Sequence, residues 1–340
     1  MNAIDQIAEK FPIGRLKTVT EIKSGLMHST YLVDSDEGQF TLQRLHKKLA
    51  TNEIIGDFEA VTNFLYDRKL VAPRLIRTSA NEPVFVDKDH RWWRMSSWVP
   101  GYTKAKVESA VEAEQGARAL GRFHKIVADL DHHFASQHPL HDTRAHLAGL
   151  KDAIQTPAYE SALHLIKPEV EQILDQLPSL ILPDSLPQRV VHGDPKISNV
   201  LFDGDAAIGL IDLDTCNRHT VLVDIGDAIR SWCRDGSEDE QQHFRIDRFE
   251  SILAGYAAEG LELTDHELDY LPQAGRTITM ELACRFARDV MVDDYFAFDA
   301  QRYPSRRLHN IARTRAMLFL ATDMVDQADQ INALIRHYFR

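Results

Sequence analysis

The chain has 340 residues, of which 44% are hydrophobic and 26% are charged, and its formal net charge is −12. This length exceeds that of a typical single core, so we expect two lobes. The negative balance argues against a general nucleic-acid surface, which needs a concentrated basic face. Acidity alone does not identify a cationic substrate, because it usually serves solubility.

The cysteine pattern and the first residues point to the cytoplasm. Cys216, Cys233 and Cys284 lie far apart and include no Cys-x-x-Cys pair, so neither a disulfide framework nor a zinc site is indicated. The N-terminus has no basic region followed by an apolar stretch, and no run approaches the roughly 18 apolar residues that a spanning helix needs. We therefore expect a cytoplasmic protein without a membrane partner. Its oligomeric state stays open.

The first hundred residues are expected to form a small sheet with one helix. Short segments rich in β-branched and aromatic residues alternate there with turns such as 34–38 and 88–90. Apolar side chains recur at helical spacing between 53 and 69. The expected strands cover residues 18–23, 29–33, 40–45, 83–87 and 92–98.

Helices dominate after Gly101, and Val99-Pro100-Gly101 is a natural hinge. A β-rich lobe over 1–98 followed by a helical lobe over 99–340 is an α+β arrangement. The expected helices cover residues 107–131, 168–177, 239–258, 265–296 in pieces, and 308–340.

One stretch carries most of the chemistry. His192-Gly193-Asp194 is followed by Asn199, and an apolar run at 207–211 ends in Asp212. Phosphoryl transfer from a nucleotide to a hydroxyl needs a carboxylate that receives the proton and oxygen ligands that hold Mg²⁺. Asp194 is the candidate base, and Asn199 and Asp212 are candidate metal ligands.

Each part of this stretch has an ordinary explanation when taken alone. A single His-x-Asp is most often a surface turn, and a single Asp-x-Asp, such as Asp212 and Asp214, is usually a solvated loop. Their order and spacing together favour function, because protein kinases combine a His-Arg-Asp loop, a downstream Asn and a separate metal-binding Asp. Asp214 would either assist a second metal ion or position Asp212.

The chain resembles the aminoglycoside phosphotransferase and choline kinase group of small-molecule kinases, and within it the N-acetylhexosamine 1-kinase branch. This resemblance implies a protein-kinase-like fold, with a small β-rich N-terminal lobe and a larger helical C-terminal lobe. It also implies ATP and Mg²⁺ as cofactors and a small-molecule hydroxyl as the partner, with no nucleic acid. The stretches that carry it are 24–33 with Gln43-Arg44, 93–102, 192–230 and 279–296.

The nucleotide is expected to contact two segments of the first lobe. The turn at 24–30 would cover the phosphates, with Gly25, His28 and Ser29 nearest to them; an ordinary hairpin turn is the alternative. Adenine is expected at the strand that enters the hinge, held by backbone groups of Ser97 and Val99.

The third strand departs from the kinase pattern. Kinases place a lysine there to pair with the nucleotide phosphates, whereas this chain has Gln43, and Arg44 should point to the opposite face. Gln43 can donate to a phosphate but cannot neutralise it. We expect Lys196, two residues after Asp194, to supply the charge; a solvated loop lysine is the alternative.

Two later helical segments leave alternatives open. Glu281, Arg285 and Asp289 share a helical face at i, i+4 spacing, which on its own predicts a solvent-facing ion-pair ladder. The resemblance instead places Arg285 on the substrate side. Asp224 and Asp227 are expected to cap a helix, and the resemblance adds that Asp224 steadies the catalytic loop.

The sequence therefore predicts an ATP- and Mg²⁺-dependent kinase that phosphorylates a hydroxyl of a small polar molecule. The resemblance favours a sugar such as an N-acetylhexosamine as the acceptor. An aminoglycoside, choline or amino-alcohol kinase is the alternative. A catalytically silent nucleotide-binding protein is a third possibility, which only the missing strand lysine supports.

Overall fold

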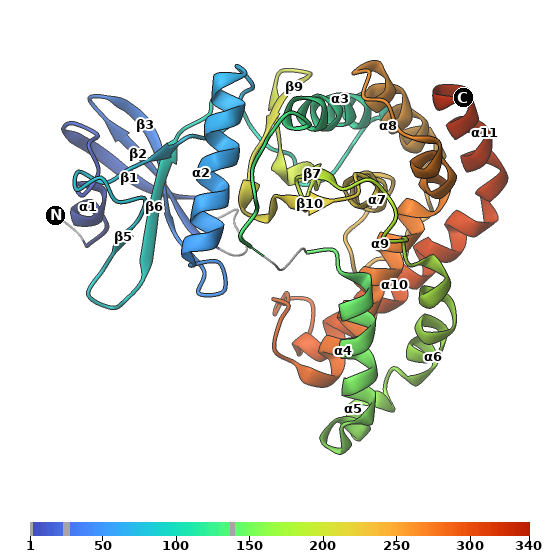
Figure 1. Cartoon of the computed structure of the whole chain (residues 1–340). Helices are drawn as coiled ribbons and strands as arrows, with labels where there is room; N and C mark the ends of the chain where they lie inside the picture. The colour runs from blue at the N-terminus through green and yellow to red at the C-terminus, as the bar shows by residue number, and fades with distance from the viewer. Residues whose placement is uncertain (1–2, 23–27, 137–139) are drawn as a thin grey trace.

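The computed structural model describes residues 3–22, 28–136 and 140–340, which form two lobes (Figure 1). The smaller lobe is an antiparallel sheet in the order β1-β2-β3-β6-β4, with β5 paired to β6. Its elements are α1 (Ala3–Ala8), β1 (Leu16–Ile22), β2 (Ser29–Ser35), β3 (Gly38–Arg44), β4 (Leu75–Ile76), β5 (Phe85–Val86) and β6 (Trp92–Ser97).

The sheet has its own hydrophobic core, and one short helix and one short strand of this lobe were not predicted from the sequence. Val33, Leu42, Trp93 and Met95 are buried on one face together with side chains of α1. Both α1 and β4 were missed, because elements of six and two residues are too short to show a periodic pattern. The predicted strands at 18–23, 29–33, 40–45, 83–87 and 92–98 correspond to β1, β2, β3, β5 and β6.

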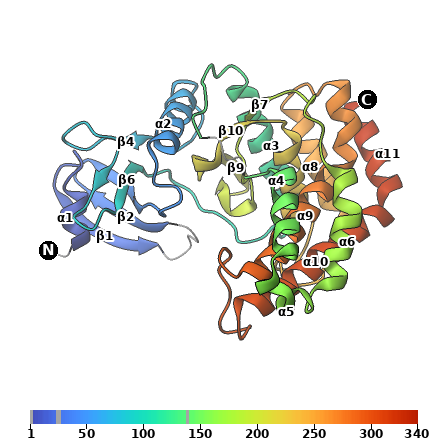
Figure 2. The same cartoon turned by 60° about the horizontal axis from the view of Figure 1, so that its bottom comes forward.

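Helix α2 (Asn52–Asp67) belongs to the first lobe in sequence but packs against the second (Figures 1 and 2). Phe58, Val61 and Leu65 are part of the core of the large lobe. Asp57 accepts hydrogen bonds from the backbone of residues 135 and 136 at 3.1 and 2.9 Å and contacts Nε2 of His132 at 2.8 Å. The helix therefore links the sheet to the larger lobe.

The larger lobe is mainly helical and carries two short antiparallel strand pairs. β7 (Arg189–Val191) pairs with β10 (Asn217–His219), and β8 (Val200–Asp203) pairs with β9 (Ala206–Leu210). Its helices are α3 (Ala110–Val127), α4 (Thr143–Gln155), α5 (Glu160–Leu163), α6 (Lys167–Gln176), α7 (Leu222–Trp232), α8 (Ile246–Ala258), α9 (Asp265–Val292), α10 (Arg306–Asp326) and α11 (Ala328–Phe339). In the described part, no helix is long and apolar enough to cross a bilayer.

Helix α9 is one continuous element of 28 residues rather than several pieces. Pro272 lies inside it and removes one backbone hydrogen bond. A capping box between Thr264 and Glu267 stabilises its start, and buried side chains follow along its whole length. Glu281 and Asp289 are 1% exposed, so the predicted solvent-facing ladder is wrong. The i, i+4 spacing showed a shared face but not that this face is buried.

Candidate active site

The loop between β7 and β8 holds Asp194, and a buried histidine fixes its shape. His192 Nε2 donates to the carbonyl oxygen of Ile211 at 3.0 Å, and its Nδ1 accepts from the Asp194 amide at 3.2 Å. One imidazole ring therefore bonds both the loop with the candidate base and the residue just before Asp212.

Gly193 permits a close approach between this loop and the segment after Asp212. Its φ is +86°, and a Cβ at this position would lie 2.5 Å from the carbonyl oxygen of Thr215. Thr215 Oγ1 in turn donates to the His192 carbonyl oxygen at 2.8 Å. Only glycine fits both the left-handed backbone and the available space.

Asp224 anchors the loop that carries Asp194 through buried hydrogen bonds. It is fully buried and accepts from the amides of His192 and Gly193 at 2.6 and 2.9 Å and from His124 Nε2 at 2.8 Å. Burial alone would raise the pKa of Asp224, but the hydrogen bond and the proximity of His124 lower it. The predicted cap is wrong, because α7 begins after Val221 without a side-chain cap. The role implied by the resemblance agrees with these contacts.

Asp224→Ala is expected to destabilise the fold by about 3–5 kcal/mol, the scale of breaking a buried charged network. Two loop amides and His124 would lose their acceptor. Thermal unfolding measures this, and Asp129→Ala at an exposed position is the matched control. Equal unfolding temperatures for the two variants would contradict the anchoring role.

Asp194 is paired with Lys196 and held by Asn199. Lys196 Nζ contacts Asp194 Oδ2, and Asn199 Nδ2 donates to the Asp194 carbonyl oxygen at 2.8 Å. Burial raises the pKa of Asp194, and nearby carboxylates add to this, against the opposing effect of Lys196. Lys196 thus contacts the predicted base, Asp194. That Lys196 also contacts a phosphate of the nucleotide stays a prediction.

Asp212 and Asn199 present oxygen atoms suited to a magnesium ion. The Ile211 amide donates to the Asn199 carbonyl oxygen at 2.9 Å, which brings the two segments together. Asp212 has a left-handed backbone (φ +66°) and an exposed side chain. Because Asn199 donates through Nδ2, its Oδ1 remains as an acceptor. Hard oxygen ligands are those that Mg²⁺ prefers, so these residues fit the metal.

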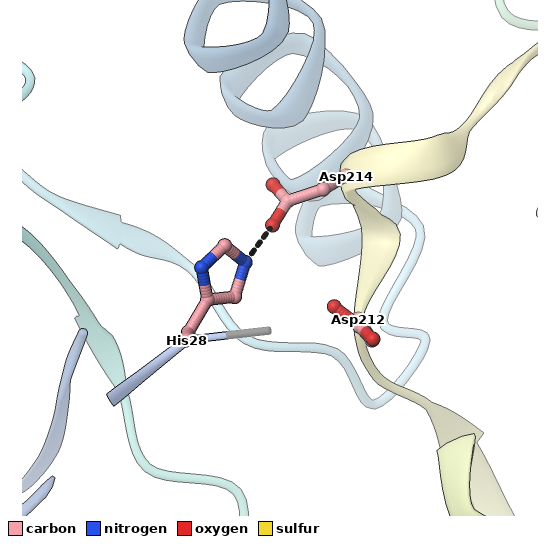
Figure 3. Close-up of side chains that lie close together, drawn as sticks. All are labelled: His28, Asp212 and Asp214. Atoms are coloured by element: carbon pink, nitrogen blue, oxygen red, sulfur yellow. Dashed lines mark hydrogen bonds and ion pairs between the residues drawn. The ribbon is translucent and has the colours of Figure 1, made fainter. Parts of the chain in front are cut away.

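Asp214 lies beside Asp212 but is already engaged (Figure 3). Its two carboxylate oxygens accept from Arg94, through Nη2 at 2.8 Å and also through Nη1, and His28 Nε2 lies 3.2 Å from Oδ2. Burial alone would raise the pKa of Asp214, but Arg94 and His28 outweigh it and hold the pKa below its ordinary range. Of the two predicted roles, these contacts favour positioning over metal binding.

The other predicted nucleotide contacts are only partly available. Gly25 lies outside the described residues. His28 contacts Asp214, and Ser29 Oγ accepts from Arg44 at 2.7 Å, so both side chains already have a partner. The Ser97 amide donates to a neighbouring carbonyl oxygen at 2.8 Å, whereas the Val99 amide has no backbone partner among the described residues. Val99 is therefore the better candidate for adenine.

Sequence reasoning missed Arg94, which contacts Gln43. Arg94 Nη2 donates to Gln43 Oε1 at 2.8 Å, and the guanidinium lies 3.9 Å from the centre of the Phe58 ring. The available signal was a single charged residue inside the otherwise uncharged run Trp92–Ser97. The predicted Arg44 does point away from Gln43, toward Ser29.

A cavity of about 600 Å³ opens next to Asp214 and Thr215. It lies between the start of α2, α4, the end of α9 and the segment that follows α9. Its lining residues are Lys48, Leu49, Thr51, Glu53, Ile54, Ala135, Ser136, Leu140, Ala145, His146, Gly149, Asp214, Thr215, Cys216, Asn217, Arg285, Arg288, Tyr295 and Phe296. This volume suits a small ligand.

Arg285 faces this cavity, and Asp289 shapes its wall. The Arg285 guanidinium lies 5.7 and 5.6 Å from the ring centres of Tyr295 and Phe296. Asp289 accepts from the amides of residues 294, 295 and 296 at 2.9–3.0 Å and from Asn310 at 2.8 Å. It therefore fixes the segment that carries both aromatic rings.

Two lobes, a candidate carboxylate base and a separate carboxylate suited to a metal ion are the features expected of a kinase-type phosphotransferase. The chain belongs to the phosphotransferase enzyme family, whose model matches residues 18–261. It is an ATP-dependent small-molecule phosphotransferase that uses a divalent metal ion such as Mg²⁺. The alternative of a catalytically silent protein is therefore dropped.

Similar proteins include kinases of small hydroxyl compounds. A homoserine kinase of Zymomonas mobilis is 25% identical over 264 residues, which are 75% of each chain. The structure of an aminoglycoside phosphotransferase from Alicyclobacillus acidocaldarius matches with a TM-score of 0.66 at 14% identity, over 98% of this chain and 96% of that one. A microcompartment-associated aminopropanol kinase matches with a TM-score of 0.65 at 15% identity, over 96% and 97%. These matches confirm the predicted fold class; they do not identify the N-acetylhexosamine branch.

Proposed function

We propose that the acceptor is a small alcohol that also carries a carboxylate, and that it binds in the cavity beside Arg285. The observation that carries this proposal is that the Arg285 guanidinium lines the cavity without a charged or hydrogen-bonding partner in the described part of the chain. This guanidinium lies 5.7 and 5.6 Å from two aromatic ring centres, but within residues 3–22, 28–136 and 140–340 it has no hydrogen-bond acceptor or ion-pair partner. A guanidinium fork suits a carboxylate through two parallel hydrogen bonds.

The charge balance of the cavity supports an anionic group. Lys48 also lines it, with Nζ 4.7 Å from the centre of the Tyr295 ring, whereas Arg288 in the lining is paired with Asp294 at 3.6 Å. Of the two acidic residues in the lining, Asp214 is neutralised by Arg94. Glu53 is left as the counterpart for an ammonium group of the acceptor.

Four side chains of this protein then account for the transfer of the phosphoryl group. The acceptor hydroxyl loses its proton to Asp194 as its oxygen attacks the terminal phosphorus of ATP, and ADP leaves. Asn199 and Asp212 would hold the metal ion, which neutralises charge on the phosphates when bound. Lys196, next to Asp194, stabilises the charge that develops on the transferred group.

Of the named relatives, the homoserine kinase agrees with this class of acceptor. Homoserine is a hydroxy amino acid, and aminopropanol is an amino alcohol without a carboxylate. An N-acetylhexosamine remains the second candidate, on the strength of Gln43, the run 211–215 and the segment 279–296 that resemble that branch. A neutral sugar would offer Arg285 hydroxyl and amide oxygens only.

A panel of acceptors in an ATP-consumption assay tests the proposal. Homoserine and the aminopropanol that lacks only its carboxylate form the decisive pair, with N-acetylhexosamines, choline and an aminoglycoside beside them. We expect the carboxylate-bearing compound to have the highest kcat/KM. Turnover confined to an N-acetylhexosamine would replace the proposed acceptor by the second candidate.

Arg285→Ala is expected to raise the KM for the carboxylate-bearing acceptor about tenfold or more, the scale of a lost charge-assisted hydrogen bond. The KM for the aminopropanol should change little, because it has no carboxylate. Steady-state kinetics on both compounds measures this difference, and Arg336→Ala on α11 is the matched control. An equal rise for both compounds would mean that Arg285 shapes the cavity without binding the carboxylate.

A further inference from the structure

The strand that enters the hinge buries an arginine in the sheet of the small lobe. Arg94 is 2% exposed and lies on β6 between the buried Trp93 and Met95. A guanidinium removed from water is costly unless it is paired and hydrogen-bonded. Its contacts should therefore show why an arginine occupies this position.

Those contacts reach the two segments that surround the nucleotide site. Arg94 pairs with both carboxylate oxygens of Asp214, two residues after the metal-binding Asp212. It also donates to Gln43 Oε1 at 2.8 Å. Strands β3 and β6 are antiparallel neighbours, and their register places Gln43 directly opposite Arg94.

The contact fixes which end of the Gln43 amide is free. A guanidinium only donates hydrogen bonds, so the amide oxygen must face Arg94 and the NH₂ group must point elsewhere. In the described part of the chain, Gln43 Nε2 has no hydrogen-bond acceptor. Phosphate oxygens only accept, and Gln43 occupies the strand position from which kinases contact phosphates. The NH₂ group is thus the correct end for a nucleotide.

The structure assigns to Arg94 the role of a positioning residue for the nucleotide phosphates. It holds Gln43 so that its NH₂ group donates to them, and it anchors Asp214 beside the metal-binding Asp212. The cation that kinases place on the third strand lies here on the neighbouring strand and acts through a neutral amide. This inference depends on the phosphotransfer site described above but not on the identity of the acceptor. Lys196, which pairs with Asp194, is not needed as a substitute for the strand lysine.

Gln43→Glu separates this role from a merely structural one. The carboxylate has the same shape and still accepts from Arg94, so the unfolding temperature should be unchanged or higher. It replaces the NH₂ group by an oxygen that faces the phosphates, and like charges in contact are strongly unfavourable. Calorimetry with Mg²⁺ and a non-hydrolysable ATP analogue should show more than about tenfold weaker binding, with Gln39→Glu, exposed on the same strand, binding as the wild type does.

A second variant covers the case in which Gln43→Glu does not fold. Gln43→Met removes the donor without adding charge and should weaken binding severalfold. Unchanged affinity in a folded Gln43→Glu or Gln43→Met variant would overturn the assignment, since the amide would then not face the phosphates. Failure of the wild type to bind the analogue at all would instead contradict the phosphotransfer site itself.

Discussion

Asp194→Asn is expected to lower turnover by about 10²-fold or more while the fold and most of the nucleotide affinity remain. An amide cannot receive the acceptor's proton, and loss of a positioned acid–base group typically has this effect. Asn keeps the shape of the side chain and can still accept from Lys196 and Asn199. Turnover measured under saturating acceptor and ATP, beside nucleotide binding by calorimetry, separates the two effects.

Two further measurements make this result specific. Asp203→Asn, exposed at the end of β8, should behave as the wild type does. Since burial raises the pKa of Asp194, the base becomes protonated, and turnover falls, at a higher pH than for an ordinary aspartate. The acidic limb of the turnover profile should therefore lie above the usual titration range of aspartate. Near-normal turnover of Asp194→Asn would mean that another group takes the proton.

The catalytic loop was predictable because its parts are close in sequence. His192, Asp194 and Asn199 lie on one loop, and β8 and β9 carry the chain directly to Asp212. Short-range spacing therefore predicted that the candidate base and the candidate metal ligands lie close together. The small sheet was likewise predictable, because its longer strands have β-branched residues and clear turns.

The remaining features depend on contacts that spacing does not encode. Arg94 and Asp214 are 120 residues apart, and their pairing arises only when the sheet docks on the large lobe. The same holds for Asp57 and His132, and for Glu281 with His141, whose Nδ1 lies 2.8 Å from a Glu281 oxygen. In each case a charged residue becomes buried because its partner comes from another element.

Asp212→Ala and Asp214→Ala are expected to affect different properties, although the two carboxylates are two residues apart. Asp212 is exposed and has no partner among the described residues, so its loss should raise the Mg²⁺ requirement and weaken nucleotide binding, with the unfolding temperature in chelator unchanged. Asp214→Ala leaves the buried Arg94 without its counter-ion and should cost about 3–5 kcal/mol of stability.

A Mg²⁺ titration of activity and thermal unfolding in chelator, applied to both variants, measure these effects. Asp205→Ala, in the exposed turn between β8 and β9, is the matched control for both. The sequence alone predicts that Asp214→Ala lowers catalysis less than Asp212→Ala does. The buried ion pair between Asp214 and Arg94 adds the prediction that Asp214→Ala lowers stability more than Asp212→Ala does. An equal shift in Mg²⁺ requirement without loss of stability would make Asp214 a metal ligand, and Arg94 would then need another explanation for its burial.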